Sequence, residues 1–434
     1  MNIVSTIVQL TVSLAILVII HECGHFLLAR LFKVRVEKFY LFFNPWFSLF
    51  KYKPKNSETE YGIGWIPFGG YVKIAGMVDE SLDREQLAKP PQPDEFRSKP
   101  AWQRLLIMIA GVVFNFLLAI AIYSGVLYHW GEEYIPLQSV TSGMEFSPTA
   151  QEIGFRDGDI LLSADGVLLE QFNENAVRQI INSKEVKVLR ENDTATVSIP
   201  ADFVNRLILH KKGFANYRSP FVVKSILKNS PAQKAGLMNG DSVVAINDAT
   251  VFIQDCIAAF ALHKGEAVRL TFFRNGEQRE ITITPDEKGK IGVYMKTPAD
   301  LYPTRKINYN LPEAIPAGIQ KGVKKLTGYV SDMKYVFTKE GFESLGGFGT
   351  IAGLFPVPFE ARSFWEITAF LSVILAFMNI LPLPALDGGH VLFLLYEIVT
   401  GRKPSDNFLE KAQIIGMILL FSLLIFANLN DVFR

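Results

Sequence analysis

The sequence predicts a polytopic α-helical membrane protein with four transmembrane helices, a membrane-associated β-hairpin region and two extracytoplasmic α+β domains. Four long segments that are nearly free of charge predict the helices, and two similar copies of one motif between the second and third segments predict the domains. Of the 434 residues, 49% are hydrophobic and the formal net charge is +1. This balance gives no indication of a nucleic-acid partner or of an acidic disordered tail.

The four apolar segments all reach the roughly 20 residues that are needed to cross a bilayer. They cover residues 3–29, 105–128, 367–396 and 412–430. The first segment lacks a positively charged leader and a small-residue cleavage site, so we interpret it as a retained helix. Glu22 in the first segment and Asp387 in the third are the only charged residues in the four segments. Polar groups at membrane depth are costly, so both carboxylates indicate a functional site.

Lysine and arginine residues cluster after the first segment, before the second, and between the third and fourth. The positive-inside rule places these loops in the cytoplasm. Both termini and the long stretch 129–366 then lie outside, which is the periplasm in a Gram-negative cell. We therefore expect a multi-pass protein of the bacterial inner membrane, with the carboxylate site toward the cytoplasmic side.

The predicted division of the chain follows from these segments and from the turn-rich stretches between them. It runs 1–34 (first helix), 35–100 (β region and linker), 101–128 (second helix), 129–215 and 216–302 (two domains), 303–362 (amphipathic helix and loop), 363–400 (third helix) and 401–434 (fourth helix). The polar, proline-bearing stretch 81–100 is the predicted linker. Cys23 and Cys256 lie in regions of different character, so no disulfide is expected.

Residues 35–76 are aromatic, glycine-rich and strand-like. An ordinary cytoplasmic hairpin fits this composition. Their apolarity favours β-structure that dips toward the membrane, which is tolerated where the backbone is paired or lines a cavity. We expect a hairpin at residues 61–73.

The region outside the membrane contains an internal repeat. "SPTAQEIGFRDGDILLSADG" (147–166) and "SPAQKAGLMNGDSVVAINDA" (230–249) both run from Ser-Pro through a short helix-like stretch to a Gly-Asp turn and alternating apolar residues. The repeat resembles tandem PDZ domains, whose groove captures an extended peptide or chain end by adding it to a sheet edge. Alternatively, the two domains act only as a rigid cap over the membrane domain.

Between residues 311 and 341, apolar side chains recur every three or four positions among lysines. This pattern suits an amphipathic helix on the membrane surface, or one packed on the two domains.

His21-Glu22-Cys23-Gly24-His25 is an HExxH motif within the first apolar segment. On a helix, residues i and i+4 share a face, so both imidazoles can bind one zinc ion. Glu22 is offset by about 100° and suits the role of a general base for an attacking water. Cys23 lies off the shared face, so we interpret it as a small buried residue.

A catalytic zinc site needs a third protein ligand and one open position. Asp387 is the expected third ligand, because a carboxylate left without a compensating charge at membrane depth would cost more than a neutral histidine. His390, three residues later, is the alternative ligand by residue type. Asp387 follows "NILPLPAL", where Pro382 and Pro384 break the helix at membrane depth. Asn379 in the same interruption either contacts the substrate or caps freed carbonyls.

Taken together, the HExxH motif, "NILPLPALDGG" and the tandem repeat resemble the site-2 protease family of intramembrane zinc metalloproteases. The resemblance covers essentially the whole chain and implies Zn²⁺ as cofactor, His21, His25 and Asp387 as its ligands, and Glu22 as the catalytic residue. It implies substrate contacts at Asn379, Pro382, Gly69 and Gly70, because "GWIPFGGYV" matches the family's membrane-associated β-hairpin. In "AGVVFN" (110–115), relatives commonly carry Gly-Pro after the alanine.

The resemblance also implies the substrates. They are transmembrane segments of single-span membrane proteins, such as an anti-sigma factor already trimmed by another protease in an envelope stress response, and remnant signal peptides. Two other classes compete with a protease. A membrane-anchored PDZ scaffold predicts a closed four-ligand zinc site, and a zinc transporter predicts several ligand clusters along a path through the membrane.

Overall fold

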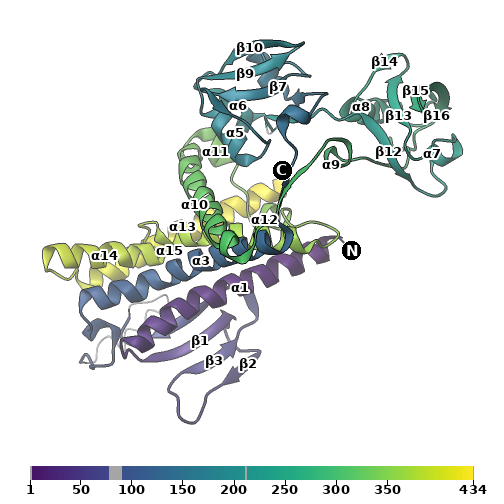
Figure 1. Cartoon of the computed structure of the whole chain (residues 1–434). Coiled ribbons are helices and arrows are strands. Elements are labelled where there is room, and N and C mark those ends of the chain that lie inside the picture. Colours follow the sequence, from purple (N-terminus) through teal and green to yellow (C-terminus); the bar gives the residue numbers. More distant parts are fainter. Residues whose placement is uncertain (1, 78–89, 211–212, 434) are drawn as a thin grey trace. The chain divides into compact units, whose positions relative to one another are not determined.

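The computed structural model describes residues 2–77, 90–210 and 213–433. The chain divides into two compact units, Met1–Gly131 with Asn308–Arg434, and Glu132–Ile307 (Figure 1). The described residues contain four helices that are long and apolar enough to cross a membrane, which confirms the predicted polytopic architecture. These spans are Ile3–Leu31, Ala101–Trp130, Ala361–Ile380 and Asn407–Phe433.

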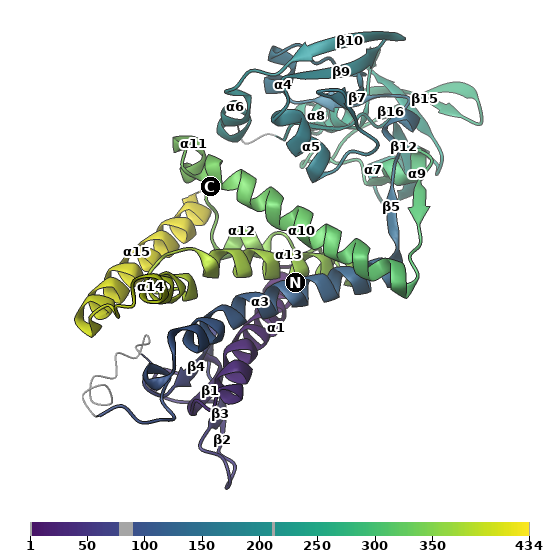
Figure 2. The same ribbon diagram turned by 60° about the vertical axis from the view of Figure 1, so that its left-hand side comes forward.

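Helix α3 (Ala101–Trp130) is the central element of the membrane unit. It packs against four other helices (Figure 2), namely α1 (Asn2–Leu31), α10 (Leu311–Val336), α13 (Ala361–Ile380) and α14 (Asp387–Thr400). Small residues allow these helices to approach closely, as is usual in membranes. A Cβ atom on Gly24 of α1 would lie 2.6 Å from the carbonyl oxygen of Ala110 in α3. The backbones of α1 and α3 are therefore in direct contact beside the HExxH motif.

The third apolar segment is two helices instead of the single helix predicted over residues 363–400. Helix α13 ends at Ile380 and α14 begins at Asp387. Pro382 and Pro384 lie between them, and proline can neither donate a backbone hydrogen bond nor continue the helix. The expected interruption is confirmed, and it places Asp387 in the first turn of a new helix.

The fourth membrane helix, α15 (Asp406–Phe433), packs against the short helix α12 (Phe348–Ala352). Short helix α11 (Lys339–Glu343) follows α10. Most of the large apolar side chains along α15 are exposed, as expected for a helix that faces lipid.

A four-stranded sheet follows α1, and its strand order is β2-β3-β1-β4. The strands are β1 (Val36–Phe43), β2 (Phe50–Tyr52), β3 (Glu60–Ile63) and β4 (Ile66–Ile74). The predicted hairpin at 61–73 is wrong, because β3 and β4 lie on opposite sides of β1 and do not pair. Strand β1 is the aromatic and β-branched run that suits a central strand, and residues 64–65 cross its end.

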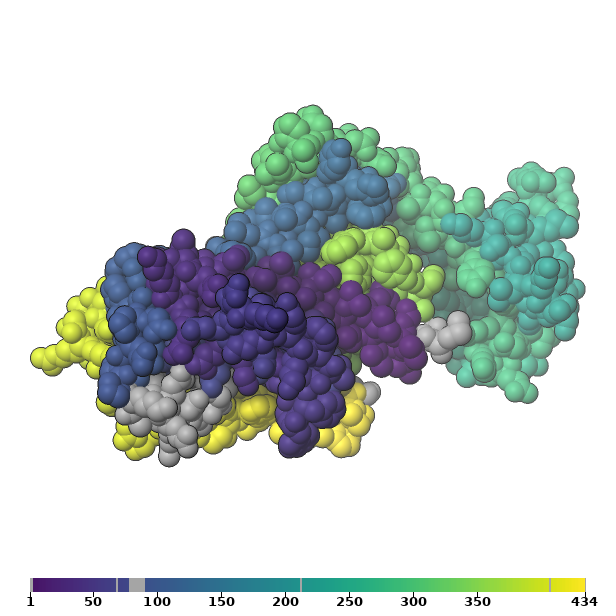
Figure 3. All heavy atoms as spheres, turned by 90° about the horizontal axis from the view of Figure 1, so that it is seen from below, coloured from purple at the N-terminus to yellow at the C-terminus, as the bar shows by residue number. Residues whose placement is uncertain are grey.

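Strand β4 forms one edge of this sheet and packs against α1. In Figure 3 the violet residues of the sheet lie at the surface beside the purple residues of α1. The other described part of the predicted 35–100 region, residues 90–100, contains a short 3-10 helix, η1 (Phe96–Ser98). Residues 78–89, which include much of the predicted linker, lie outside the described residues.

The second unit contains two α+β modules that share the order strand, helix, strand, strand, helix, strand, strand and then differ. In the first, a sheet of order β10-β9-β7-β8 and a two-stranded sheet β11-β6 surround one apolar core. Its elements are β6 (Met144–Phe146), α4 (Pro148–Glu152), β7 (Ile160–Ala164), β8 (Val167–Leu168), α5 (Glu174–Ile181), β9 (Glu185–Arg190), β10 (Asp193–Ser198), α6 (Phe203–Leu209) and β11 (Ala215–Tyr217).

The second module has its own core and a sheet of order β16-β15-β13-β12-β17, with β14 paired to β13. Its elements are β12 (Phe221–Ile226), α7 (Pro231–Lys234), β13 (Ser242–Ile246), β14 (Ala249–Thr250), α8 (Ile253–Leu262), β15 (Val268–Arg274), β16 (Glu277–Ile283) and β17 (Val293–Met295). Strands β5 (Glu132–Tyr134) and β18 (Arg305–Ile307), which follows α9 (Pro298–Leu301), pair at the ends of the unit.

The internal repeat extends to one buried ion pair in each module. Asp159 in the first Gly-Asp turn is 1% exposed and pairs with Arg190 at 2.7 Å. Asp241 in the second turn is fully buried and pairs with Arg274 at the same distance. The two modules therefore repeat not only in sequence but also in the contact that closes their turns.

Helix α10 matches the predicted amphipathic helix. Its small residues Ala314, Gly318 and Gly322 are buried, and Gly318 and Gly322 lie against Ser124 and Ile120 of α3. Its larger apolar residues Ile315 and Ile319 are exposed. The helix thus packs on the membrane helices through small residues and leaves an apolar face uncovered by its own unit.

Candidate active site

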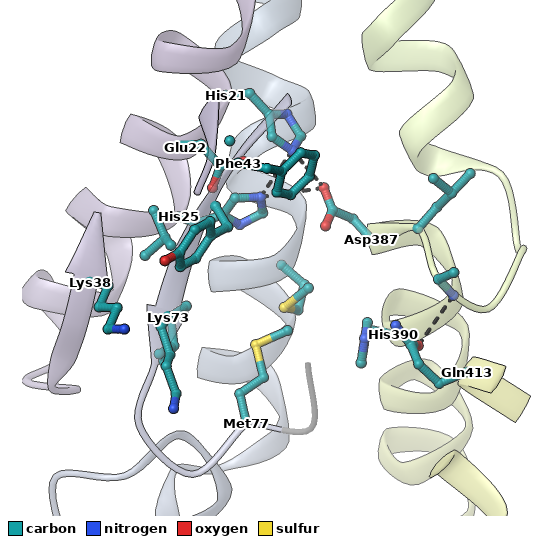
Figure 4. A pocket seen from close by; sticks show the side chains of 17 residues that line it. His21, Glu22, His25, Lys38, Phe43, Lys73, Met77, Asp387, His390 and Gln413 are labelled. Atoms are coloured by element: carbon teal, nitrogen blue, oxygen red, sulfur yellow. Dashed lines mark hydrogen bonds and ion pairs between the residues drawn. The ribbon is translucent and has the colours of Figure 1, made fainter. Parts of the chain in front are cut away.

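Three potential metal ligands converge between α1 and α14 (Figure 4). His21 and His25 lie one turn apart on the same face of α1, and Asp387 is the first residue of α14. Asp387 Oδ2 lies 3.1 Å from His21 Nε2 and 3.3 Å from His25 Nε2. The two Nε2 atoms are 3.2 Å apart. The structure therefore brings together the three residues that the sequence predicted as ligands.

The donor set fits a zinc ion. Asp387 Oδ2 is buried, and apart from the two imidazole nitrogens it has no polar partner among the described residues. A buried carboxylate oxygen is costly unless a proton or a metal ion compensates its charge. A tetrahedral ion with ligand distances of about 2.0–2.1 Å separates its ligand atoms by about 3.3–3.4 Å. The three interatomic distances of 3.1–3.3 Å match that separation. Two imidazoles and one carboxylate are also ligands that zinc commonly takes in catalytic sites.

Glu22 and the three ligands line one cavity of about 390 Å³. Residues of α1, β1, β4, α3, α14 and α15 form its walls (Figure 4). The carboxylate of Glu22 lies near the backbone of Val72 in β4. This offset from the ligand face suits a base that acts on an attacking water instead of binding the ion.

The other predicted site residues fall at different places around the cavity. Asn379 Nδ2 is 3.4 Å from His21 Nε2, so its amide reaches the metal centre. Gly70 lines the cavity, whereas Gly69 and Pro382 are not among its lining residues. Asn379, Gly69, Gly70 and Pro382 remain predicted substrate contacts. His390 lines the cavity but stands outside the three-residue ligand group.

Sequence analysis missed the contribution of α3 to the site. His25 Nδ1 lies 2.9 Å from the carbonyl oxygen of Ile107 and donates to it, because a carbonyl can only accept. Asn115 is fully buried and its Nδ2 lies 3.3 Å from His21 Nδ1. Gly111 leaves room for both rings. The one sequence signal was Asn115 itself, an amide within a charge-free apolar segment.

Gln413 of α15 was missed as well. It is buried, it lines the cavity, and its Oε1 accepts a hydrogen bond from the Ala385 N–H at 3.2 Å. Ala385 has a φ of +88°, which is rare for an L-residue and costly unless the surroundings hold it. Gly416 lets α15 approach Pro384 closely. Helix α15 therefore holds the turn that presents Asp387.

These features define a membrane-embedded metallopeptidase: an HExxH helix and an aspartate from a broken helix meet in a cavity between apolar helices and a β-sheet. The model for peptidase family M50 matches residues 9–423. The chain belongs to this family, the site-2 protease family, and is a zinc metalloprotease of the class that acts in regulated intramembrane proteolysis.

Curated relatives match over almost their whole length. The regulator of sigma E protease of Haemophilus influenzae is 29% identical, with 98% of this chain and 97% of the relative covered. A putative zinc metalloprotease of Vibrio cholerae is 30% identical with the same coverage. A putative zinc metalloprotease of Clostridium acetobutylicum is 28% identical, again with 98% and 97% covered. The expected similarity to regulator-of-sigma-E proteases is thus confirmed.

Proposed function

We propose that the chain hydrolyses peptide bonds within the transmembrane segments of single-span membrane proteins. The observation that carries this proposal is the convergence of His21, His25 and Asp387 beside Glu22 in a cavity between apolar helices and the sheet that follows α1. A protease built at this depth acts on segments that enter the membrane. The relative named regulator of sigma E protease supports a role in a sigma-E-type stress response. The proposed substrates are an anti-sigma factor in that response and, as a second group, remnant signal peptides.

In the proposed mechanism His21, His25 and Asp387 hold the zinc ion. When bound, zinc supplies Lewis-acid activation of the substrate carbonyl and of the attacking water. Glu22 takes the proton of that water and later delivers it to the leaving amine. Asn379, whose amide lies beside His21, donates to the developing oxyanion.

The substrate must be extended before it is cut, because a helix keeps its carbonyls in internal hydrogen bonds. Strand β4 supports such a step. It is an edge strand of its sheet, and residues 70–74 line the catalytic cavity. A substrate segment added to this edge would run beside Glu22 as a further strand. We assign Gly70 to this contact.

Aromatic side chains support a membrane-associated position for the sheet. Trp46 is 91% exposed and its ring stacks on Trp65 at 6.1 Å between centroids. The ring of Phe47 also stacks on Trp65, at 5.6 Å between centroids. Exposed tryptophans of this kind are typical of the membrane–water interface.

In the proposed topology the protein lies in the bacterial inner membrane with both termini outside and the cavity toward the cytoplasm. The two α+β modules are then periplasmic and PDZ-like, and they take peptides or chain ends as ligands. The run of elements that the two modules share and the Asp–Arg pair that each contains support one duplicated module. Among the described residues the ligand group is a single three-residue cluster, which favours a protease over a zinc path or a closed four-ligand site.

The test is Glu22→Gln in the full-length protein, reconstituted with a single-span reporter that carries a fluorescent domain on its cytoplasmic side. We expect cleavage to fall about 10²–10⁴-fold, the range of a lost general base, while zinc content stays at the wild-type level. Glu152→Gln, which changes an exposed carboxylate in α4, is the matched control and should cleave normally. Undiminished cleavage by Glu22→Gln would refute the assigned base.

A further inference from the structure

One face of α3 supports the two imidazoles on the side opposite Asp387. The face consists of Ile107, Gly111 and Asn115, which are spaced four residues apart and so lie in one row. Ile107 contributes its carbonyl oxygen to His25, and Asn115 contributes its amide to His21. Residues of α3 therefore contact both of the imidazoles that would bind the metal ion, although no α3 residue belongs to the ligand group.

The nitrogen that faces α3 is the same in both rings. Each Nε2 atom faces Asp387, so each Nδ1 atom faces α3. A ring that binds metal through Nε2 carries its proton on Nδ1, and that N–H needs an acceptor. Ile107 supplies one for His25. The only described partner of His21 Nδ1 is the side chain of Asn115.

The carboxamide of Asn115 has one accepting end and one donating end. Its Nδ2 faces His21 Nδ1, while its Oδ1 is buried without a hydrogen-bond donor among the described residues. The two ends have nearly the same shape, so a half-turn of the amide places Oδ1 against the ring nitrogen. Only that orientation can accept from Nδ1–H and leave Nε2 free to bind metal.

We infer that Asn115 is a positioning residue: its Oδ1 accepts the Nδ1–H of His21 and fixes the tautomer and ring orientation that bind zinc. The backbone at this position is itself fixed, because the carbonyl oxygen of Asn115 accepts a hydrogen bond from Ser372 Oγ at 2.7 Å. Asn115 and Ser372 are both fully buried, so bulk water does not compete for their hydrogen bonds. This inference rests on His21 being a zinc ligand, as proposed above.

The experiment measures zinc affinity by chelator competition, and the absorption spectrum of the Co²⁺ form, in the purified full-length protein. Asn115→Leu removes the acceptor and should weaken zinc binding about 10–100-fold, the usual effect of losing such a partner. Asn115→Ala also removes the acceptor, but without adding a bulky side chain. It replaces Asn115→Leu as the test variant if leucine disturbs the packing. Asn115→Asp keeps the acceptor and should bind zinc within a few-fold of wild type.

Thr368→Ala is the matched control. It removes a buried side-chain hydrogen bond to the carbonyl oxygen of Phe364 within α13, which involves neither Asn115 nor an imidazole, so zinc affinity and the Co²⁺ spectrum should not change. Wild-type affinity in both Asn115→Leu and Asn115→Ala would overturn the inference and leave the ligand assignment intact. Weak binding by Asn115→Asp, in a metal-free protein as heat-stable as wild type, would also overturn it. A wild-type protein that binds no zinc would overturn the ligand assignment and the inference together.

Discussion

Gly111 of α3 lies so close to His21 of α1 that a Cβ atom at position 111 would be 2.6 Å from the Cε1 atom of the ring. The same Cβ would lie closer still to His25 Nε2. Real Cβ atoms do not approach other heavy atoms this closely, so any side chain here must displace both imidazoles. The metal centre thus depends on the absence of a side chain in a neighbouring helix.

Gly111→Ala should therefore cost the protein its zinc. Overpacking of this kind typically costs about 1–3 kcal/mol, and here the strain falls on two ligands. Gly125→Ala in the same helix is the control, since no atom lies within 4 Å of its added Cβ. Elemental analysis of both purified variants decides the matter. Full zinc content in Gly111→Ala would show that the rings are not held against α3.

How far the sequence predicts this site depends on whether the signal lies within one element or between elements. Residues four apart on one helix share a face, so His21 and His25 could be paired from their spacing alone. Asp387 could be added because the apolar segments hold only one other carboxylate, Glu22. Gly111 and Asn115 could not be assigned, because no periodicity tells which face of α3 meets α1.

The sheet shows the same limit. The aromatic and β-branched run of β1 was recognisable as a strand, but strand order was not. The hairpin at residues 61–73 was predicted from aromatic and glycine-rich composition and from the resemblance to the family, and composition does not determine which strands pair. In the structure, residues 64–65 instead carry the chain across the end of β1, and β4 becomes the edge beside the cavity.

The buried ion pairs should matter more to the α+β modules than exposed ones do. Arg274→Leu leaves the carboxylate of Asp241 buried without its partner, which should lower the free energy of unfolding of that module by about 3 kcal/mol. Arg269 lies in the same strand as Arg274 and forms an exposed ion pair with Asp248. Arg269→Leu breaks that pair and should lower the free energy of unfolding by at most about 1 kcal/mol. Pulse proteolysis of the full-length protein measures both. Equal losses would contradict the role given to burial.

Cys256 should be unreactive in the folded protein. Burial, followed by the neighbouring Asp255, raises the pKa of its thiol from 9.0 to about 12. The folded state therefore favours the neutral thiol, and this contribution to stability is complete below pH 9 and is lost as the pH rises toward 12. Iodoacetamide at pH 8 in a Cys23→Ala background should label Cys256 only after unfolding.

An exposed cysteine introduced as Lys264→Cys in the same module provides the control, and it should be labelled readily in the folded state. Equally fast labelling of native Cys256 would mean that the module opens or that the thiol is not buried.

Asp300 should titrate below the ordinary range. The hydrogen bond from Lys224, and next those from Thr297, lower the pKa of this carboxyl from 3.8 to about 2. The stability it contributes is therefore present above pH 4 and is lost as the pH falls toward 2. Lys224→Met should move the pKa upward toward 3.8, as followed by NMR of the labelled carboxyl carbon. Lys228→Met, an exposed lysine of the same module, should leave it in place.

The central claim is that one zinc ion is held by two imidazoles of α1 and one carboxylate of α14. Elemental analysis of the detergent-purified chain tests it most directly, with His21→Ala, His25→Ala, Asp387→Ala and His390→Ala compared. We predict one zinc per chain in the wild type and in His390→Ala, and loss of zinc in the other three variants. A wild-type chain without stoichiometric metal, or unchanged zinc content when His21, His25 and Asp387 are all replaced by alanine, would contradict the account.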